Sequence, residues 1–438
     1  MKTAAGAFLA GATSRLLPAS IPFRFFGAAV VYHLLAWLAL LAGADRVPRF
    51  AGGFGWPLAA LHLVTLGVLV MTAIGASLQL LPVATRQPVR RVRWAAAIWW
   101  LYTPGVAAVG FGMGSGAPLL LGLGAVGVLL ALLAFAALLA NNLRAARGMP
   151  GVVVHGWAAL ACLLVVLATA LSLALAGMGL PLLDRATGLA LHIAFAGYGF
   201  MGLLAFGLSF ILVPMFALSN APDERRAIAS CALAVAALAL AALAAFAGSG
   251  MAPRVLRIGA ICLGAAAVAL HLRLMLGALR SGMRRQLGRS FTLVRIGWAA
   301  LVATLFVALG IVLDAPLPGL PSLFGLTLIA GWLLTFLLGM LQRILPFLAS
   351  MHAAQGRKRP ATPSSLSAER PLAIHFACHL TALAGLALAV VADSVTLAAL
   401  AAGVGALGAA AFAAFFLILL RRMRGGAPAA QADGTPIA

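Results

Sequence analysis

Acidic side chains are scarce in this sequence of 438 residues, which holds eight Asp and Glu against 30 Lys and Arg. Only 9% of the residues are charged, 64% are hydrophobic, and the mean hydropathy is +1.11. Soluble globular domains usually carry about 25% charged residues. The scarcity of charge therefore excludes a soluble globule and indicates an integral membrane protein, whose first partner is the lipid bilayer.

The few acids and cysteines exclude several kinds of site. All eight acids fall in predicted loops, helix ends or the C-terminal tail, whereas intramembrane proton relays are marked by ionisable groups inside the spans. This placement argues against a proton pump and against transport driven by a buried carboxylate. The four cysteines occur singly, with no CxxC or Cys/His spacing, and we interpret them as small packing residues.

Long apolar segments dominate the chain, and twelve of them approach the roughly 20 residues that a membrane-spanning helix needs. They are predicted at 22–44, 56–82, 93–113, 117–141, 152–177, 186–217, 226–248, 256–280, 290–314, 321–349, 371–392 and 395–421. Short connections predict one membrane domain over residues 1–424 and a disordered tail over 425–438. The segment before the first span shows no evident cleavable signal peptide, and 351–371 is predicted to be flexible.

The formal net charge of +22 would suggest nucleic acid in a soluble protein, but its distribution points elsewhere. Basic residues gather in alternate connections, for example at 86–93, 280–289 and 421–424, and the intervening connections hold few. This alternation follows the positive-inside rule and predicts cytoplasmic N and C termini, which an even number of spans allows. We therefore expect no nucleic-acid partner and a bacterial inner membrane location.

A motif recurs three times at equal spacing. GASLQLLP (75–82), GLSFILVP (207–214) and GMLQRILP (339–346) share a first Gly and a last Pro, and the interval between successive motifs is the same. Each repeat unit therefore holds four of the twelve helices. We interpret the glycines as sites of close helix approach and the prolines as helix ends or kinks, and we expect Arg343 to reach the lipid headgroups.

Two of the three motif-bearing helices open with a histidine, His62 in the first and His192 in the second. The segments HLVTLGVLVMTAIGASLQLLPV, HIAFAGYGFMGLLAFGLSFILVPMF and GMLQRILPFL resemble subunit I of the haem-copper oxidases, particularly the C-type oxidases and nitric-oxide reductases. A looser resemblance is to the NnrS family of haem- and copper-containing membrane proteins. The first resemblance implies an all-α fold of twelve transmembrane helices in three pseudo-symmetric four-helix arcs, with metal-ligating histidines on helices 2, 6 and 10.

The sequence departs from that family at its metal ligands. Helix 10 has no histidine within the predicted span, since His352 lies beyond its end, and helix 7, ASCALAVAALALAALAAFAGSG, has none at all. Ala and Leu cannot replace the imidazoles of a copper site. We therefore expect haem b without copper, and we expect the isolated protein not to reduce oxygen or nitric oxide at the rate of a dedicated oxidase.

His62 is the predicted haem ligand, because neutral imidazole is a good axial ligand and its apolar surroundings suggest few other uses. Its partner would be His192 or His33, or the sixth position would be open to a gas. Each histidine has the alternative role of a hydrogen bond to a neighbouring helix. His375 and His379 share one helical face, a spacing that can grip a metal or serve packing. His155, His271 and His352 are expected near the interface, and Gly67 and Gly75 are expected to leave room for a macrocycle.

Three functions remain open at this point. The first is a haem-binding, non-pumping relative of the oxidases, acting in electron transfer, haem handling or gas sensing, with a respiratory complex subunit or electron donor as partner. The second is a transporter or channel that uses the same scaffold without haem. The third is an assembly or structural subunit of a respiratory complex. An absorption spectrum separates the first from the other two.

Overall fold

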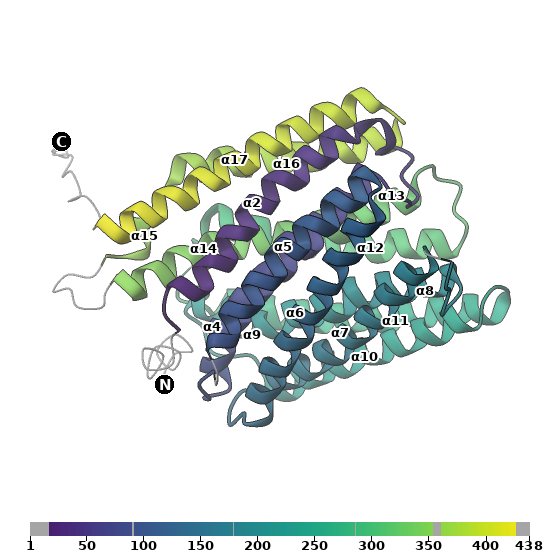
Figure 1. The fold of residues 1–438 in the computed structure, drawn as a ribbon. Coiled ribbons are helices and arrows are strands. Elements are labelled where there is room, and N and C mark those ends of the chain that lie inside the picture. The colour runs from purple at the N-terminus through teal and green to yellow at the C-terminus, as the bar shows by residue number, and fades with distance from the viewer. Residues whose placement is uncertain (1–16, 90–91, 178, 285, 354–360, 426–438) are drawn as a thin grey trace, which may run out of the picture.

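The protein is described by a computed structural model over residues 17–89, 92–177, 179–284, 286–353 and 361–425. Within these ranges the secondary structure is helical, with short connections (Figure 1). Residues 1–16, part of the predicted flexible loop (354–360) and the predicted tail from 426 onward lie outside the described residues.

Twelve helices in the described residues are long and apolar enough to cross a membrane. The predicted spans match them closely, and the largest difference is at α11, which was expected from 256 and begins at Met251. The spans are α2 (Ser20–Ala42), α3–η2–α4 (Trp56–Ala84), α5 (Arg93–Ser115), α6 (Pro118–Arg144), α7 (Pro150–Ala176), α8–η3–α9 (Arg185–Ala217), α10 (Glu224–Phe246), α11 (Met251–Ser281), α12 (Gly288–Val312), α13–η4–α14 (Leu320–Ala353), α16 (Glu369–Val391) and α17 (Val395–Gly425). Two short helices, η1 (Ala44–Arg46) and α15 (Pro363–Leu366), lie in connections.

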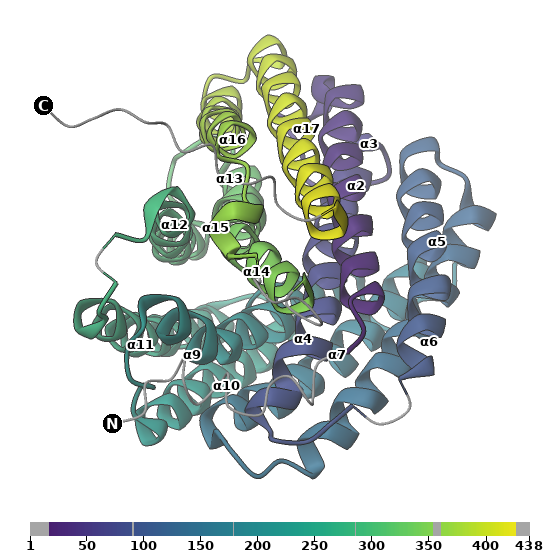
Figure 2. The ribbon, with the colours of Figure 1, turned by 90° about the vertical axis from the view of Figure 1, so that its left-hand side faces the viewer.

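The helices form three units of the same design, which confirms the predicted arcs. In each unit the first helix packs on the second, as α2 does on α4, α7 on α9 and α12 on α14. The third and fourth helices form a close pair: α5 with α6, α10 with α11, and α16 with α17. The last helix, α17, packs against the first, α2, and this contact closes the ring seen in the end view (Figure 2).

The second helix of each unit occupies the interior, and we call α3–η2–α4, α8–η3–α9 and α13–η4–α14 the central helices. Every residue of α4 from Met71 to Ala84 is buried, as is nearly all of α9 from Leu203 to Ala217. We call the end where the central helices begin the distal end, and the end where they finish, which also carries Leu17 and Gly425, the proximal end. The central helices therefore form the core, and the other helices present apolar surface to lipid.

Each central helix contains a π-helical segment near its distal end. These segments are η2 (Leu63–Val70), η3 (Phe195–Gly202) and η4 (Leu326–Leu334). Each segment ends shortly before the motif glycine of its own helix, so the π-helical segments repeat with the sequence motif. π-Helices are rare, and those inside α-helices are frequently found at functional sites. Their threefold recurrence marks the distal half of the core as the place to look for function.

The motif glycines allow close approach between the first and second helix of each unit, as predicted. An added Cβ would lie 3.0 Å from Phe25 Cβ at Gly75, 2.8 Å from His155 Cβ at Gly207 and 2.6 Å from the Ser290 carbonyl oxygen at Gly339. The motif prolines differ from the prediction of helix ends. Pro82, Pro214 and Pro346 all lie inside helices. These helices continue beyond the prolines to Ala84, Ala217 and Ala353, respectively.

Arg343, which is predicted to reach the lipid headgroups, binds protein acceptors at the start of α12. Its Nε donates to Ser290 Oγ at 2.7 Å, and its terminal nitrogen donates to the Leu287 carbonyl. Hydrogen bonds from a guanidinium to protein acceptors replace the water it would otherwise find at the interface. The side chain therefore joins the proximal end of α14 to the start of α12.

Candidate functional site

His62 and His192 lie in the distal segments α3 and α8 of two central helices, ahead of η2 and η3, and His192 stands two residues further from its motif glycine than His62 does. The central helices that carry them are neighbours, since α4 contacts α9 further along the core. Although they belong to the core helices, both side chains remain partly exposed, as do Thr65 beside the first and Ala194 beside the second. The structure therefore places two of the three predicted site histidines at partly exposed positions in the distal half of neighbouring central helices.

Hydrogen bonds fix which nitrogen of each ring carries the proton. His62 Nδ1 lies 3.0 Å from the Leu58 carbonyl oxygen, so Nδ1 must donate. His192 Nδ1 lies 3.3 Å from Thr169 Oγ1, and that hydroxyl already gives its only hydrogen to the Val165 and Val166 carbonyls. His192 Nδ1 must therefore donate as well.

Both rings consequently present Nε2 as a free lone pair. A backbone carbonyl or hydroxyl that accepts from Nδ1–H is the usual arrangement behind a metal-binding histidine, because it sets the tautomer and the ring orientation. The chemistry of this donor set fits two axial imidazoles of a haem iron. His62 and His192 can thus act as ligands without rearranging their hydrogen bonds.

The glycines near His62 have a different role from the one predicted. A Cβ at Gly67 would lie 2.6 Å from Tyr32 Cγ, and one at Gly75 would meet Phe25. Both glycines therefore make room for helix α2, and neither provides a flat surface for a macrocycle. The Tyr32 hydroxyl donates in turn to the Thr103 carbonyl on α5, so this side of η2 is filled by protein.

His33, the third predicted site residue, lies in a different cluster. Its ring centroid is 5.9 Å from that of His375, which is itself 5.6 Å from His379. All three side chains are buried, at 1%, 0% and 2% exposure. The predicted His375–His379 pair is therefore joined by His33 from α2, and we call these three residues the histidine cluster. Sequence reasoning missed it because the spacing of one helical face cannot reveal a partner on another helix.

His155 and His271, which are expected near the interface, form a second pair of histidines buried inside the bundle. Both are fully buried, with His271 stacked on Phe206 at 3.8 Å between ring centroids. Phe210 meets both imidazoles edge-on at 5.3 Å. His352 is the exception, since it is half-buried near the proximal end of α14 beside Phe23.

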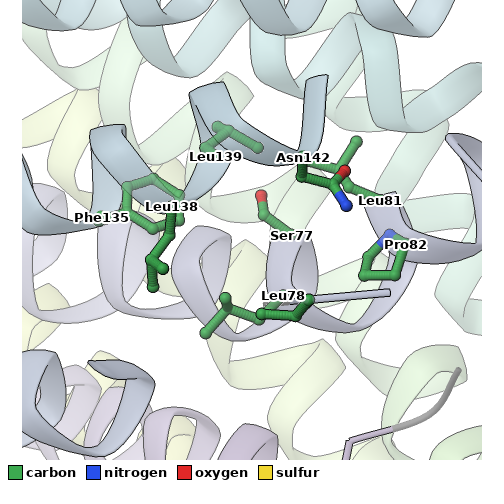
Figure 3. A pocket seen from close by; sticks show the side chains of 9 residues that line it. Ser77, Leu78, Leu81, Pro82, Phe135, Leu138, Leu139 and Asn142 are labelled. Carbon is green, nitrogen blue, oxygen red and sulfur yellow. The ribbon is translucent and has the colours of Figure 1, made fainter. Parts of the chain in front are cut away.

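A small cavity lies between α4 and α6, away from the histidines (Figure 3). Its volume of about 10 Å³ is near the least that a buried water needs. The Ser77 hydroxyl points into it without a partner, beside Asn142, whose amide accepts from Thr85. This cavity is far too small for a prosthetic group, and it is lined by Ser77, Leu78, Leu81, Pro82, Val89, Phe135, Leu138, Leu139 and Asn142.

Acidic residues stay outside the interior of the bundle in the described residues, in line with the sequence reading. Asp184 and Asp223 cap the starts of α8 and α10 by accepting backbone hydrogen bonds at 2.9 and 2.8 Å. The hydrogen bonds from Thr187 lower the pKa of the Asp184 carboxyl below its usual value. Among the described residues, no group of three or more His, Cys, Asp or Glu side chains is arranged to hold a metal ion.

Comparison with solved structures identifies a similar fold. A haem-copper terminal oxidase, determined as a dimer by cryo-EM, superposes with a TM-score of 0.65 and 13% sequence identity, covering 93% of this chain and 84% of that chain. At this identity the similarity concerns the fold. No protein-family model and no curated protein matches the sequence.

Proposed function

We propose that this membrane protein binds haem b through His62, with His192 as the second axial ligand, and acts in electron transfer, haem handling or gas sensing. The observation that carries the proposal is the pair of free Nε2 atoms on neighbouring central helices, each oriented by a hydrogen bond from Nδ1. The twelve-helix fold shared with a haem-copper terminal oxidase supports it.

The chain's own groups would hold and tune the haem. The Leu58 carbonyl accepts from His62 and so raises the basicity of its Nε2, while Thr169, anchored to the Val165 and Val166 carbonyls, does the same for His192. A bound haem would supply one-electron redox chemistry or a site for a gas ligand.

We further propose that the protein neither pumps protons nor holds copper. Helix α10, at the position of helix 7, contains no histidine in its sequence, and the acids of the described spans lie at helix ends. The charge alternation supports a bacterial inner membrane with both termini in the cytoplasm, where a respiratory complex subunit or an electron donor would be the partner.

An absorption spectrum of the protein, expressed with haem supply, tests the proposal. Wild-type protein is expected to show a Soret band with the features of a six-coordinate haem. His62→Ala should remove the band, and His192→Ala should retain haem in a five-coordinate form. His271→Ala serves as the control, because His271 is buried in a different part of the bundle, and it should leave the spectrum unchanged.

Two results would contradict the proposal. Wild-type protein without Soret absorption, or a His62→Ala variant with an unchanged spectrum, would favour a transporter, channel or assembly subunit on the same scaffold. Stoichiometric copper beside a high-spin haem, with turnover of oxygen or nitric oxide, would overturn the proposed lack of a copper site.

A further inference from the structure

The histidine cluster, His33 with His375 and His379, is an unusual concentration of polar groups in the interior of the bundle. Its surroundings are aromatic: the Phe412 ring of α17 lies 4.9 Å from His375 and 6.3 Å from His33, between centroids. One ring nitrogen of each imidazole is buried with no hydrogen-bond partner among the described residues: His33 Nδ1, His375 Nε2 and His379 Nδ1. An unpaired buried polar atom is costly, so three in one place require an explanation.

The tautomer of His33 is set by Trp37. The indole Nε1–H can only donate, and it lies 3.2 Å from His33 Nε2, so this nitrogen must be the acceptor. A neutral imidazole carries one proton, which must then be on Nδ1. The unpartnered nitrogen of His33 is therefore a donor.

The tautomers of the other two rings follow in the same way. His375 Nδ1 lies 3.1 Å from the Gly408 carbonyl oxygen, so it donates and leaves Nε2 as a lone pair. Thr335 gives its hydroxyl hydrogen to the Ala330 carbonyl at 2.7 Å, so its oxygen accepts from His379 Nε2 at 2.8 Å. This leaves His379 Nδ1 as a lone pair. The cluster thus presents one donor and two acceptors.

We propose that the histidine cluster binds a single water molecule. Water offers two hydrogens and accepts at its oxygen, which matches the two lone pairs of His375 and His379 and the N–H of His33. Buried waters typically make about three such bonds to otherwise unsatisfied groups. The same molecule satisfies all three unpartnered nitrogens.

A metal cation matches the cluster less well than water. A cation needs lone pairs from its ligands, and His33 Nδ1 carries a hydrogen for as long as Trp37 donates to the other ring nitrogen. The remaining pair, His375 and His379, would supply only two ligands. The acid on the same helix, Glu369, is exposed at the start of α16 and pairs with Arg289. Charge complementarity therefore favours a neutral ligand.

The proposed water would join the first and third units of the ring. His33 belongs to α2 of the first unit, His375 and His379 to α16 of the third, and Thr335 to the central helix α14. Gly408 of α17 completes the network through its carbonyl. The site would therefore hold the seam at which α17 meets α2, independently of any haem at His62.

Histidine nitrogen NMR of the full-length protein tests the assigned tautomers. His33 and His375 are expected as neutral Nδ1–H forms and His379 as the neutral Nε2–H form. Trp37→Phe should release His33 from its fixed tautomer and leave the other two assignments in place. Trp99→Phe is the matched control, because that indole donates to the Arg24 carbonyl, and it should change none of the three. A His33 with its proton on Nε2, or a charged ring at neutral pH, would overturn the proposal.

A cryo-EM map that resolves ordered waters tests the ligand itself. One peak is expected at hydrogen-bonding distance, roughly 2.7–3.2 Å, from His33 Nδ1, His375 Nε2 and His379 Nδ1 together. A map with ordered waters elsewhere and no peak here would refute the site. Stoichiometric zinc or copper that is lost in His379→Ala would show that the ligand is a metal and would overturn the water assignment.

Discussion

The motif glycines Gly75 and Gly339 show how single positions set the distances between helices in this bundle. At Gly339 an added Cβ would lie 2.6 Å from a backbone carbonyl oxygen, that of Ser290. At Gly75 the nearest atom would be the Phe25 Cβ, at 3.0 Å, and Gly122 in α6 has open space around it. Backbone atoms cannot move aside as readily as a side chain. Gly339, Gly75 and Gly122 therefore differ in how well they tolerate an added methyl group.

We predict that Gly339→Ala destabilises the protein more than Gly75→Ala, because the added methyl must push α12 and α14 apart. Overpacking of this kind costs about 1–3 kcal/mol. The matched control is Gly122→Ala, which should cause no loss, since nothing lies within 4 Å of its Cβ position. Thermal unfolding in detergent measures the order of the three variants. Equal midpoints for Gly339→Ala and Gly122→Ala would contradict the role of close approach.

At the scale of elements, the π-helical segments are the features that distinguish the central helices from the others. The Tyr102 hydroxyl of α5 donates to the Leu66 carbonyl within η2 at 3.0 Å. The Tyr198 hydroxyl, in η3, is buried without a partner among the described residues. The two tyrosines therefore offer a matched pair for testing what a side-chain hydrogen bond contributes to such a segment.

We predict that Tyr102→Phe loosens η2, because the Leu66 carbonyl loses a hydrogen bond worth about 1 kcal/mol. Hydrogen exchange of the amides in Leu63–Val70 should become faster, and the unfolding midpoint should fall. Tyr198→Phe should cause no loss of stability, since it removes a hydroxyl that has no partner. A larger loss in Tyr198→Phe than in Tyr102→Phe would refute this assignment of the hydrogen bonds.

At the scale of the whole molecule, an ion pair at the distal end ties the first and third units together. Arg49, between α2 and α3, donates through Nε to both carboxylate oxygens of Asp393, between α16 and α17, at 2.9 and 2.8 Å. Nearby, Ser322 donates to the Phe50 carbonyl at 2.8 Å. The hydrogen bond and charge of Arg49 lower the pKa of the Asp393 carboxyl below its usual 3.8.

We predict that Asp393→Asn lowers stability slightly, and only where the wild-type carboxyl is ionised. Because the folded-state pKa is depressed, the stabilisation is present above the unfolded pKa of 3.8 and is lost as the pH falls through the lower folded value. Asn tolerates the left-handed backbone at this position, where φ is 47°. Unfolding midpoints of both proteins should therefore converge in acid. Asp45→Asn is the control. A difference between the unfolding midpoints of Asp393→Asn and the wild type that grows as the pH falls would contradict the prediction.

The orientation of the bundle is predicted by its charge. Basic residues gather at the proximal end, so a topology reporter inserted after Arg285, between α11 and α12, should report a cytoplasmic position. A reporter in the connection between α16 and α17, at the opposite end, is the control and should report an external position. The reverse pattern would overturn the predicted location of both termini.

The sequence by itself determined the number of spans, their limits and the threefold repeat. These properties follow from local composition: an apolar run must cross the bilayer as a helix, since only a helix satisfies its own backbone there. Gly75, Gly207 and Gly339 marked the repeat because each unit needs the same close contact. The sequence also selected His62 and His192, because both lie near the start of a motif-bearing helix, 13 and 15 residues before the motif glycine.

Only the tertiary structure decided which side chains meet. His33 joins His375 and His379 because α17 closes the ring against α2, bringing residues from opposite ends of the sequence into one cluster. Arg343 turns to Ser290 because α12 lies beside it, and Gly67 serves α2 because Tyr32 occupies its surface. The π-helical segments have no signal in the sequence, because the central helices are apolar on all sides and a rotation of the following residues therefore leaves no change of pattern. Contacts between distant helices depend on packing of the complete ring, which local periodicity does not contain.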